Sequence, residues 1–457
     1  MRPDSTPADV APLEAILGDR LVRDPELMRP FARDTSRAAL EGDPIGVVLA
    51  ESTADVSEAL RWASSTGTPV SVRGAGTGLA GGAMAYAGGL VISLERMARI
   101  IDIDVANGLA IVQPGVITAE LDAAAREHGL FFPPDPASAR ISTVGGNIAT
   151  NAGGLRCVAH GVTSDSVARL EVVLGDGRVL RTGARTRKNV VGYDLTRLFV
   201  GSEGTLGVVT EATVRLKPVP AGEPRTFRAS FRDLESAGRA VSAIVAGQAR
   251  PEVLELMDAL SVEIIESFRP SGLTVPRGAM LVGQTVGHFG ADAQAEAEAI
   301  TALCRSLGAD DTAISDTDEL LEARRLSNPA LNARGLKLSC DVGVPVAALA
   351  EVFRGISEIS ARHGKRVSTV AHAGDGNLHS TVESSDAAAD IVAADAVLDD
   401  ITRLALSLGG TISGEHGIGS LKRHELPWQQ DDVALSVQRS IKAALDPAGV
   451  LTPGRAI

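Results

Sequence analysis

Apolar runs and segments with helical spacing alternate irregularly along the chain. Runs rich in valine, isoleucine and leucine predict strands at residues 46–50, 68–72, 90–94, 109–114, 168–180 and 207–216. The stretch T-A-D-V-S-E-A-L-R-W-A-S-S has helical spacing, and Thr53 is expected to cap it. Asp176 and Gly177 form a D-G pair that predicts a hairpin turn. Because strands and helices mix without strict alternation, the pattern predicts an α+β fold.

The P-V-P-A-G-E-P stretch at residues 218–224 is the clearest linker in the chain. Beyond it, T-F-R-A-S-F and M-L-V-G-Q-T-V predict strands, and each precedes an amphipathic segment that predicts a helix. Repeated strand-plus-helix units of this kind indicate an antiparallel sheet covered by helices. Residues 8–40 have helical spacing and predict an N-terminal helical cap, and the last 45 residues are expected to be mainly helical.

Composition narrows the classes of function. The formal net charge of −13 argues against nucleic acid as a partner, because phosphate binding requires a basic surface. Three cysteines with no C-x-x-C spacing argue against a disulfide framework or an iron–sulfur cluster on this chain. The N-terminus lacks the pattern of a secretion signal, and no apolar run predicts a transmembrane segment. A cytoplasmic protein is expected, either free or peripheral at the membrane.

Three glycine-rich loops lie in the first half of the chain. The first, R-G-A-G-T-G-L-A-G-G at 73–82, contains a G-x-G-x-x-G match, but the residues that follow are poor helix formers, which argues against a Rossmann turn. The others are S-T-V-G-G-N-I-A-T-N-A-G-G at 142–154 and L-F-V-G-S-E-G-T-L-G-V at 198–208. Backbone N–H groups without a neighbouring Cβ can converge on phosphate oxygens. Three such loops favour a long ligand with a central pyrophosphate over isolated tight turns.

Three of the eight histidines of the chain, together with one glutamate, lie in two short motifs, A-H-A-G-D-G-N-L-H-S at 371–380 and S-G-E-H-G-I-G at 413–419. The turn formers in A-G-D-G-N should fold the chain back and bring His372 and His379 together. With Glu415, these imidazoles would form an open site for Zn²⁺, Mn²⁺ or another first-row divalent ion. His416 follows directly, and imidazole suits a general base near neutral pH.

These motifs, with P-P-D-P-A-S and G-S-E-G-T-L-G-V-V-T-E-A, closely resemble the FAD-linked D-2-hydroxyacid dehydrogenase family, a branch of the vanillyl-alcohol-oxidase flavoprotein superfamily. That branch includes D-lactate dehydrogenases, the glycolate oxidase flavin subunit and D-2-hydroxyglutarate dehydrogenases. The resemblance implies a two-part FAD-binding domain of vanillyl-alcohol-oxidase type and a substrate domain. It suggests an N-terminal cap at 1–41, the FAD-binding domain at 42–219, the substrate and metal domain at 220–410, and a C-terminal segment at 411–457 that returns to the FAD domain.

The resemblance also assigns residues to the cofactor. The pyrophosphate is expected at Gly74, Ala75, Gly76, Thr77, Gly78 and Gly81, and Arg73 is a further expected contact of the cofactor. The flavin and ribityl chain are expected at Pro134, Asp135, Ser142, Gly145, Gly146, Asn147, Thr150, Gly153 and Gly154, and the adenine side at Glu203, Gly204 and Val208. Thr77 stands where covalent members often carry histidine, so non-covalent FAD is expected.

For the second half, the resemblance gives His372, His379 and Glu415 as metal ligands and His416 as the base that takes the substrate hydroxyl proton. Arg324 is expected to bind the substrate carboxylate, because a guanidinium grips a carboxylate bidentately. The tryptophan usual near this position in the family is missing here, and Arg325 next to it stays an alternative. Lys337 and Asn377 are further candidates for substrate contact.

The sequence therefore predicts oxidation of a D-2-hydroxyacid to the 2-oxoacid, with D-lactate or glycolate favoured and D-2-hydroxyglutarate as the alternative. A quinone, a cytochrome, an electron-transferring flavoprotein or an iron–sulfur subunit must then reoxidise the flavin, and a homodimer stays open. A second hypothesis is a non-catalytic FAD-binding subunit of an oxidase complex. A third is a metal-dependent hydrolase, but this hypothesis does not explain the glycine-rich loops.

Overall fold

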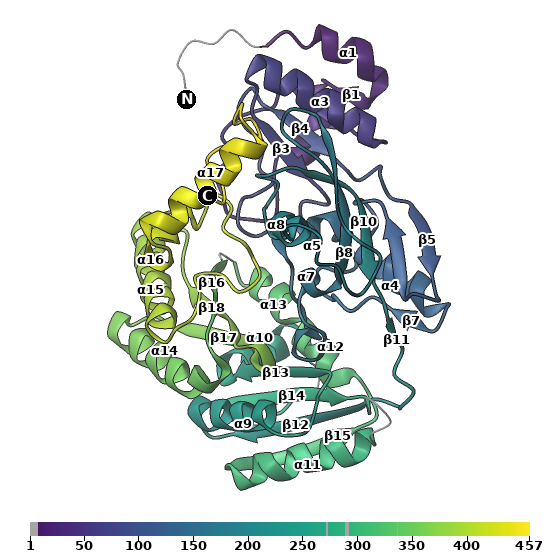
Figure 1. Cartoon of the computed structure of the whole chain (residues 1–457). Helices are drawn as coiled ribbons and strands as arrows, with labels where there is room; N and C mark the ends of the chain where they lie inside the picture. The colour runs from purple at the N-terminus through teal and green to yellow at the C-terminus, as the bar shows by residue number, and fades with distance from the viewer. Residues whose placement is uncertain (1–7, 271–272, 288–291, 336) are drawn as a thin grey trace. The chain divides into compact units, whose positions relative to one another are not determined.

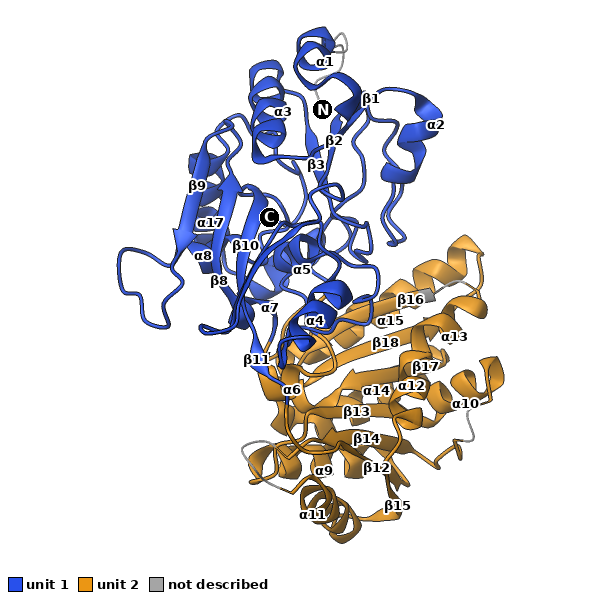
Figure 2. Ribbon diagram, turned by 90° about the vertical axis from the view of Figure 1, so that its right-hand side faces the viewer, with its two compact units in different colours: residues 1–153, 162–219, 416–457 blue, residues 154–161, 220–415 orange. Residues whose placement is uncertain are grey.

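The computed structural model describes residues 8–270, 273–287, 292–335 and 337–457. The chain divides into two compact units (Figures 1 and 2). The first unit contains Met1–Gly153, Val162–Val219 and His416–Ile457, and the second contains Gly154–Gly161 and Pro220–Glu415. The chain thus passes between units after Gly153, after Gly161, within the predicted linker, and between Glu415 and His416. The four predicted domain ranges stay predictions.

A four-stranded sheet with the order β1-β2-β4-β3 forms one part of the first unit. Its strands are β1 (Leu21–Val22), β2 (Gly46–Leu49), β3 (Val70–Arg73) and β4 (Leu90–Ser93). The helices around it are α1 (Ala11–Leu17), η1 (Gly18–Arg20), α2 (Pro25–Met28), η2 (Arg29–Phe31) and α3 (Thr53–Thr66). The N-terminal segment therefore contains helices, as predicted, but also strand β1, which the helical spacing did not predict.

Two local predictions in this region are decided by the structure. The cap of α3 is Ser52 and not Thr53, because the Ser52 hydroxyl accepts the Asp55 N–H while Asp55 accepts the Ser52 N–H. The Rossmann interpretation of the first glycine loop is excluded, because residues 74–89, all of them described, contain no helix.

The second part of the first unit is a five-stranded antiparallel sheet with the order β5-β6-β10-β8-β9. Its strands are β5 (Ile100–Asp104), β6 (Leu109–Val112), β8 (Val167–Val173), β9 (Val179–Gly183) and β10 (Val208–Arg215). The predicted D-G turn joins β8 to β9, and Gly177 adopts φ +83° there. A separate pair joins β7 (Leu130–Phe131) to β11 (Lys217–Pro218).

Short helices complete the first unit. They are α4 (Thr118–Arg126), α5 (Val144–Thr150), α7 (Thr163–Ser166), α8 (Leu195–Phe199), η6 (Arg423–Glu425), α16 (Leu426–Gln429) and α17 (Asp432–Leu445). Buried side chains of β6, β8, β10, α4 and α5 form one apolar core, and those of α1, α3, β2 and β4 form another. The three glycine-rich loops all begin in this unit.

The second unit is built on a seven-stranded sheet with the order β15-β12-β14-β13-β17-β18-β16, in which all neighbours are antiparallel. The strands are β12 (Arg225–Phe231), β13 (Val253–Asp258), β14 (Ala279–Thr285), β15 (Ala309–Ser315), β16 (Lys337–Gly343), β17 (Val367–His372) and β18 (Asn377–Glu383). Its helices are α6 (Cys157–His160), α9 (Leu234–Ala246), α10 (Ala259–Phe268), α11 (Ala293–Ser306), α12 (Glu319–Arg325), α13 (Ser327–Ala333), η4 (Val346–Ala348), α14 (Leu349–His363), η5 (Ala373–Asp375) and α15 (Ala388–Ser407).

Both faces of this sheet are covered, which confirms the predicted antiparallel sheet with helices. Leu254 and Leu256 of β13 pack into a core with α9, α11, α14 and α15. Val253 and Met257 of the same strand pack into a second core with α10 and α12. Side chains alternate between the two faces along a strand, so Glu255 projects on the same face as Val253 and Met257. That face carries α10, α12 and α13. No helix among the described residues of the chain is both long and apolar enough to cross a membrane.

Candidate functional site

A tight turn brings the two histidines of the 371–380 motif together. His372 ends β17, η5 follows, and β18 begins at Asn377, so the predicted turn is confirmed. Gly376 adopts φ +75°, and a Cβ there would lie 2.0 Å from the Val344 carbonyl oxygen. Only glycine fits this corner without strain. As a result, the His372 and His379 rings lie edge to face with centroids 5.2 Å apart.

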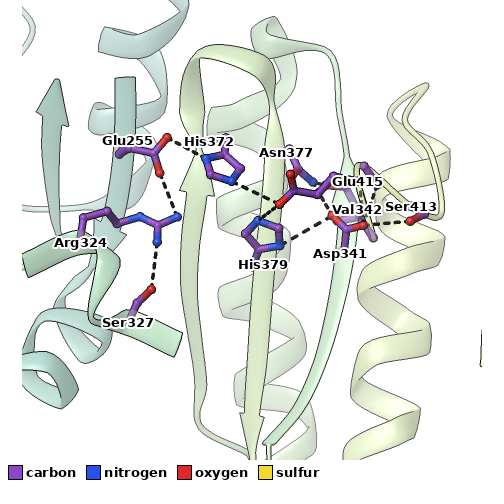
Figure 3. A network of polar contacts seen from close by, with 11 residues as sticks. Glu255, Arg324, Ser327, Asp341, Val342, His372, Asn377, His379, Ser413 and Glu415 are labelled. Atoms are coloured by element: carbon purple, nitrogen blue, oxygen red, sulfur yellow. Dashed lines mark hydrogen bonds and ion pairs between the residues drawn. The ribbon is translucent and has the colours of Figure 1, made fainter. Parts of the chain in front are cut away.

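Glu415 points at both of these rings (Figure 3). Its Oε1 lies 3.3 Å from His372 Nε2 and 3.2 Å from His379 Nε2. One ligand atom from each of the three side chains lies within 4.8 Å of the others. Two imidazole nitrogens and a carboxylate oxygen thus converge in the second unit, which is the donor set of an open divalent-metal site.

Each histidine faces a carboxylate on an adjacent strand of the sheet. Glu255 on β13 is the cross-strand partner of His372, and its Oε1 lies 2.8 Å from His372 Nδ1. Asp341 on β16 is the cross-strand partner of His379, and its Oδ1 lies 3.7 Å from His379 Nδ1. Carboxylates in this position orient a metal-binding imidazole and leave its other nitrogen for the metal.

Asp341 also holds the loop that carries Glu415. Its Oδ2 accepts the Ser413 hydroxyl at 2.9 Å, the Gly414 N–H at 3.0 Å and the Glu415 N–H at 2.9 Å. Its Oδ1 accepts the Asn377 side-chain amide at 2.6 Å. The amide of Asn377, predicted as a substrate contact, is therefore bound to Asp341 and to the Val342 carbonyl oxygen. Asp341 ties the two metal-site motifs together.

The predicted substrate cations lie in different surroundings. Arg324 on α12 is buried, with Nη2 2.9 Å from Glu255 Oε2 and Nη1 2.9 Å from Ser327 Oγ. Arg325 is exposed and pairs with Glu322 on the same helix. The backbone of Lys337 pairs with that of Glu383, but its side chain lies outside the described part of the structure.

The electrostatics of the cluster fit a divalent cation. Three carboxylates, those of Glu255, Asp341 and Glu415, face the two imidazoles, and Arg324 pairs with Glu255. Carboxylates gathered around imidazole nitrogens attract a cation, so the residues present suit a divalent ion.

The pKa shifts point in the same direction. Burial alone lowers the pKa of His372, but the carboxylates of Glu255 and Glu415 outweigh burial and hold this pKa well above its ordinary value. Burial alone raises the pKa of Glu415, but His372 and His379 hold it well below its ordinary value. The cluster therefore favours positive charge next to an ionised carboxylate.

The glycine loops of the first unit fit a phosphate-bearing cofactor. A Cβ on Gly74 would lie 2.3 Å from Thr143 Oγ1, so the first and second loops are closely packed. Gly76 adopts φ +69°, and the backbone N–H groups of Ala75, Gly76, Thr77 and Gly78 donate to no acceptor in the described part of the chain. Half-buried N–H groups of this kind are the donors that bind phosphate oxygens.

Several predicted FAD contacts also have partners inside the protein. The Arg73 guanidinium is buried and donates to the Arg33 carbonyl oxygen. The Asn147 amide donates to Thr118 Oγ1 at 2.7 Å, and the Ser142 hydroxyl lies 3.3 Å from the same atom. A Cβ on Gly81 would lie 2.3 Å from Ser420 Oγ, and a Cβ on Gly204 would lie 3.7 Å from Thr452 Cγ2.

The remaining predicted FAD residues, apart from Gly154, lie in loops, in α5 or at the start of β10 of the first unit. Pro134 and Asp135 follow β7, Val208 begins β10, and Gly145, Gly146 and Thr150 lie in α5. Gly153 ends a segment of the first unit, whereas Gly154 begins the α6 segment of the second.

Glu203, predicted near the adenine, also anchors the segment after His416. Its Oε1 accepts the Ile418 N–H and its Oε2 accepts the Gly419 N–H, both at 2.8 Å. Burial raises the pKa of Glu203, and these two donors offset part of that rise. Gly417 adopts φ +81° in the same turn. Glu203 therefore fixes the backbone just beyond His416, a role that the glycine-rich motif did not indicate.

Sequence reasoning also missed Glu255 and Asp341. Each is an acidic residue within a mostly apolar run, V-L-E-L-M at 253–257 and L-S-C-D-V-G-V at 338–344. A charged residue in such a strand is rarely buried unless it is paired, and this is the signal that could have identified both.

Two family profiles match most of the chain. The profile described as FAD binding domain matches residues 44–183, and the profile described as FAD linked oxidases, C-terminal domain, matches residues 223–456. The chain is 40% identical over 418 residues to the glycolate oxidase subunit GlcD of Bacillus subtilis, covering 90% of this chain and 88% of that protein.

Two further relatives are similar over nearly their whole length. Identity is 38% over 418 residues to a D-lactate dehydrogenase of Archaeoglobus fulgidus, covering 90% of this chain and 91% of that protein. It is 35% over 460 residues to a D-2-hydroxyglutarate dehydrogenase of Xanthomonas citri pv. viticola, covering 97% and 95%. Among solved structures, p-cresol methylhydroxylase matches with a TM-score of 0.81 and 17% identity over 98% of this chain and 96% of that one, which shows a shared fold.

Proposed function

Because the chain belongs to the FAD linked oxidases, we propose that it is an FAD-dependent dehydrogenase that oxidises a D-2-hydroxyacid to the 2-oxoacid. The observation that carries this proposal is the convergence of His372, His379 and Glu415 in a chain that also has an FAD-binding domain. FAD, bound non-covalently by the glycine loops, would accept a hydride from the substrate carbon. The predicted FAD contacts in those loops belong to this proposal.

The metal-site residues would bind and polarise the substrate. His372, His379 and Glu415 would hold a divalent ion, Zn²⁺ or Mn²⁺, which supplies a Lewis acid that lowers the pKa of the substrate hydroxyl. His416, next to Glu415 in the chain, would take the hydroxyl proton while the carbon loses its hydride. Arg324, Lys337 and Asn377 are retained as candidates for substrate contact, although Arg324 and Asn377 already have internal partners.

D-lactate or glycolate is the favoured substrate, because relatives with 38–40% identity carry those names. D-2-hydroxyglutarate is the alternative, from the relative with 35% identity. The two electrons would leave the reduced cofactor to an external quinone, cytochrome, electron-transferring flavoprotein or iron–sulfur subunit. The word subunit in the name of the Bacillus relative supports an oxidase complex, and a non-catalytic FAD-binding subunit of such a complex is the competing proposal.

Anaerobic reduction of the purified protein tests these alternatives. We expect a flavin absorption band that D-lactate or glycolate bleaches and L-lactate does not. The variant His416→Ala should retain the flavin band but lower the rate of bleaching by about 10²–10⁴-fold, the contribution of a general base. A protein that binds flavin but is bleached by no D-2-hydroxyacid would support the non-catalytic subunit, and a colourless protein would refute both proposals.

A further inference from the structure

The guanidinium of Arg324 is already engaged on both of its terminal nitrogens. Nη2 lies 2.9 Å from Glu255 Oε2, and Nη1 donates to Ser327 Oγ at 2.9 Å. The other Glu255 oxygen lies 2.8 Å from His372 Nδ1. A single carboxylate thus joins Arg324 to a predicted metal ligand (Figure 3), and Arg324, Glu255 and His372 are all buried.

We propose that Arg324 and Glu255 are positioning residues of the metal site, in which Arg324 fixes Glu255 and Glu255 orients the imidazole of His372. The inference rests on the proposed function, because it takes His372 as a metal ligand. A guanidinium has five N–H donors, and the contacts with Glu255 and Ser327 use two of them, so a substrate carboxylate bound by the remaining donors would share Arg324 with Glu255. The geometry therefore couples the expected substrate arginine to metal affinity.

The physical reason is the shared carboxylate. A hydrogen bond from Nδ1–H of His372 to Glu255 fixes the tautomer and keeps the Nε2 lone pair toward Glu415. Without Arg324, Glu255 would be a buried carboxylate without its cation, and it would move or bind another group. Loss of such an outer partner typically lowers metal affinity 10–100-fold.

Metal affinity in three variants tests the inference independently of turnover. Each protein is dialysed against buffered Zn²⁺ and Mn²⁺, and the bound metal is measured by mass spectrometry. We expect Arg324→Met and Glu255→Gln to weaken metal binding about 10–100-fold, with partial rescue in Arg324→Lys. Arg325→Met is the matched control, because Arg325 adjoins Arg324 but is exposed and pairs with Glu322.

The outcomes separate this inference from the proposed function. If Arg324→Met binds metal as tightly as the wild type, the inference is overturned and the proposed dehydrogenase function is unaffected. A wild-type protein that binds neither metal overturns the metal site itself. If Arg324→Met does not fold, Ser327→Ala and Arg324→Lys carry the test, and wild-type affinity in both also overturns the inference.

A different observation concerns the loop between β9 and α8, residues 184–194. Its sequence, A-R-T-R-K-N-V-V-G-Y-D, has three cations before its single acid. Arg185, Arg187 and Lys188 are exposed, and Val190, Val191 and Tyr193 are 96%, 86% and 94% exposed. Figure 2 shows the loop extending from β9 beyond the body of the first unit. Large apolar side chains so fully exposed and so close together mark an interaction surface.

We infer that this loop binds an anionic lipid bilayer at its surface. The chain as a whole carries a net charge of −13, which an anionic surface repels. The three cations of this loop form a local positive group that an anionic surface attracts. Valine and tyrosine suit the boundary between headgroups and acyl chains. Eleven residues are too few for a stable protein interface, which needs about 800 Å² on each partner, whereas a bilayer accepts a short loop without a complementary surface.

Sedimentation of the holoprotein with vesicles tests this inference. We expect binding to vesicles of two parts phosphatidylcholine to one part phosphatidylglycerol, little binding to pure phosphatidylcholine, and loss of binding at high salt. The triple variant Arg185→Gln, Arg187→Gln, Lys188→Gln should partition about a hundredfold less, and Val190→Ser with Val191→Ser should also bind less. The control replaces three exposed arginines of the same unit, Arg61, Arg96 and Arg178, with glutamine.

Three results would overturn the bilayer assignment. The wild-type protein fails to sediment with anionic vesicles, or the loop variants sediment like the wild type, or the control variant loses as much binding as the loop variants. Slower flavin reoxidation by a soluble acceptor protein in the loop variants, without vesicle binding in the wild type, would instead assign the loop to protein docking.

Discussion

Asp341 is the residue on which the geometry of the proposed metal site depends most. Its Oδ2 accepts three donors from Ser413, Gly414 and Glu415, and its Oδ1 accepts the Asn377 amide. In Asp341→Asn, the amide nitrogen must face at least one of these donors, which leaves a buried polar group unpaired. We expect a loss of about 1–3 kcal/mol in the free energy of unfolding and weaker metal binding.

Urea unfolding and metal content measure the two effects. Asp311→Asn is the matched control, because Asp311 pairs with Arg228 at the exposed edge of the same sheet. If Asp341→Asn is no less stable than this control and retains its metal, Asp341 does not organise the loop of Glu415.

At the scale of elements, Asp258 joins helix α10 to strand β17. Its Oδ1 accepts the Ser261 N–H and its Oδ2 accepts the Thr369 N–H, both at 2.7 Å. Burial is the largest effect and raises the pKa of Asp258 from 3.8 to about 6, although these hydrogen bonds lower it. The protonated form is therefore favoured by folding. Its stabilising contribution is complete below pH 4 and is lost as the pH rises through about 6.

The variant Asp258→Asn should remove this pH dependence while it keeps a helix cap. Between pH 4 and pH 7, the wild type should lose up to about 3 kcal/mol of unfolding free energy relative to the variant. Urea denaturation of both proteins across this range measures the difference, and Asp292→Asn at the exposed cap of α11 is the control. If the unfolding free energies of the wild type and Asp258→Asn change with pH in parallel, the raised pKa of Asp258 is refuted.

Local patterns predicted the elements well but not their partners. Runs such as L-V-I-S-L and the D-G turn specify a strand or hairpin within a few residues, so β4 and the β8–β9 hairpin lie where the sequence placed them. Ser52 displaced Thr53 as a cap because the choice depends on which hydroxyl reaches the Asp55 N–H. Strand β1 was missed because its two residues are defined by pairing with β2.

The site shows the same limit. His372, His379 and Glu415 could be grouped from the sequence because a short turn-forming segment separates the histidines. The pairing of Glu255 with His372 joins strands 117 residues apart, and no local pattern encodes that register. Arg324 was expected to be open to substrate, and its contact with Glu255 follows from the packing of α12 against the sheet.

For the whole molecule, the two proposed binding functions belong to different units. The glycine loops and the matched FAD-binding domain lie almost entirely in the first unit, whereas His372, His379 and Glu415 lie in the second. Removal of the metal should therefore leave the flavin in place. Dialysis against a chelator should keep the flavin absorption band but lower its bleaching by D-lactate or glycolate by about a hundredfold, because a Lewis acid contributes several kcal/mol to such a step.

Restoration by added ion completes this experiment. Added Zn²⁺ or Mn²⁺ should restore the rate at which the substrate bleaches the flavin. The ion that restores this rate at the lower concentration is the one that better suits two imidazoles and one carboxylate. In His379→Ala the same addition should restore little, because one of the three ligands is gone, although its flavin band stays. If the chelator releases flavin together with metal, the two sites are not independent. If chelated wild-type protein is bleached at the normal rate, the three side chains act in the reaction without a metal.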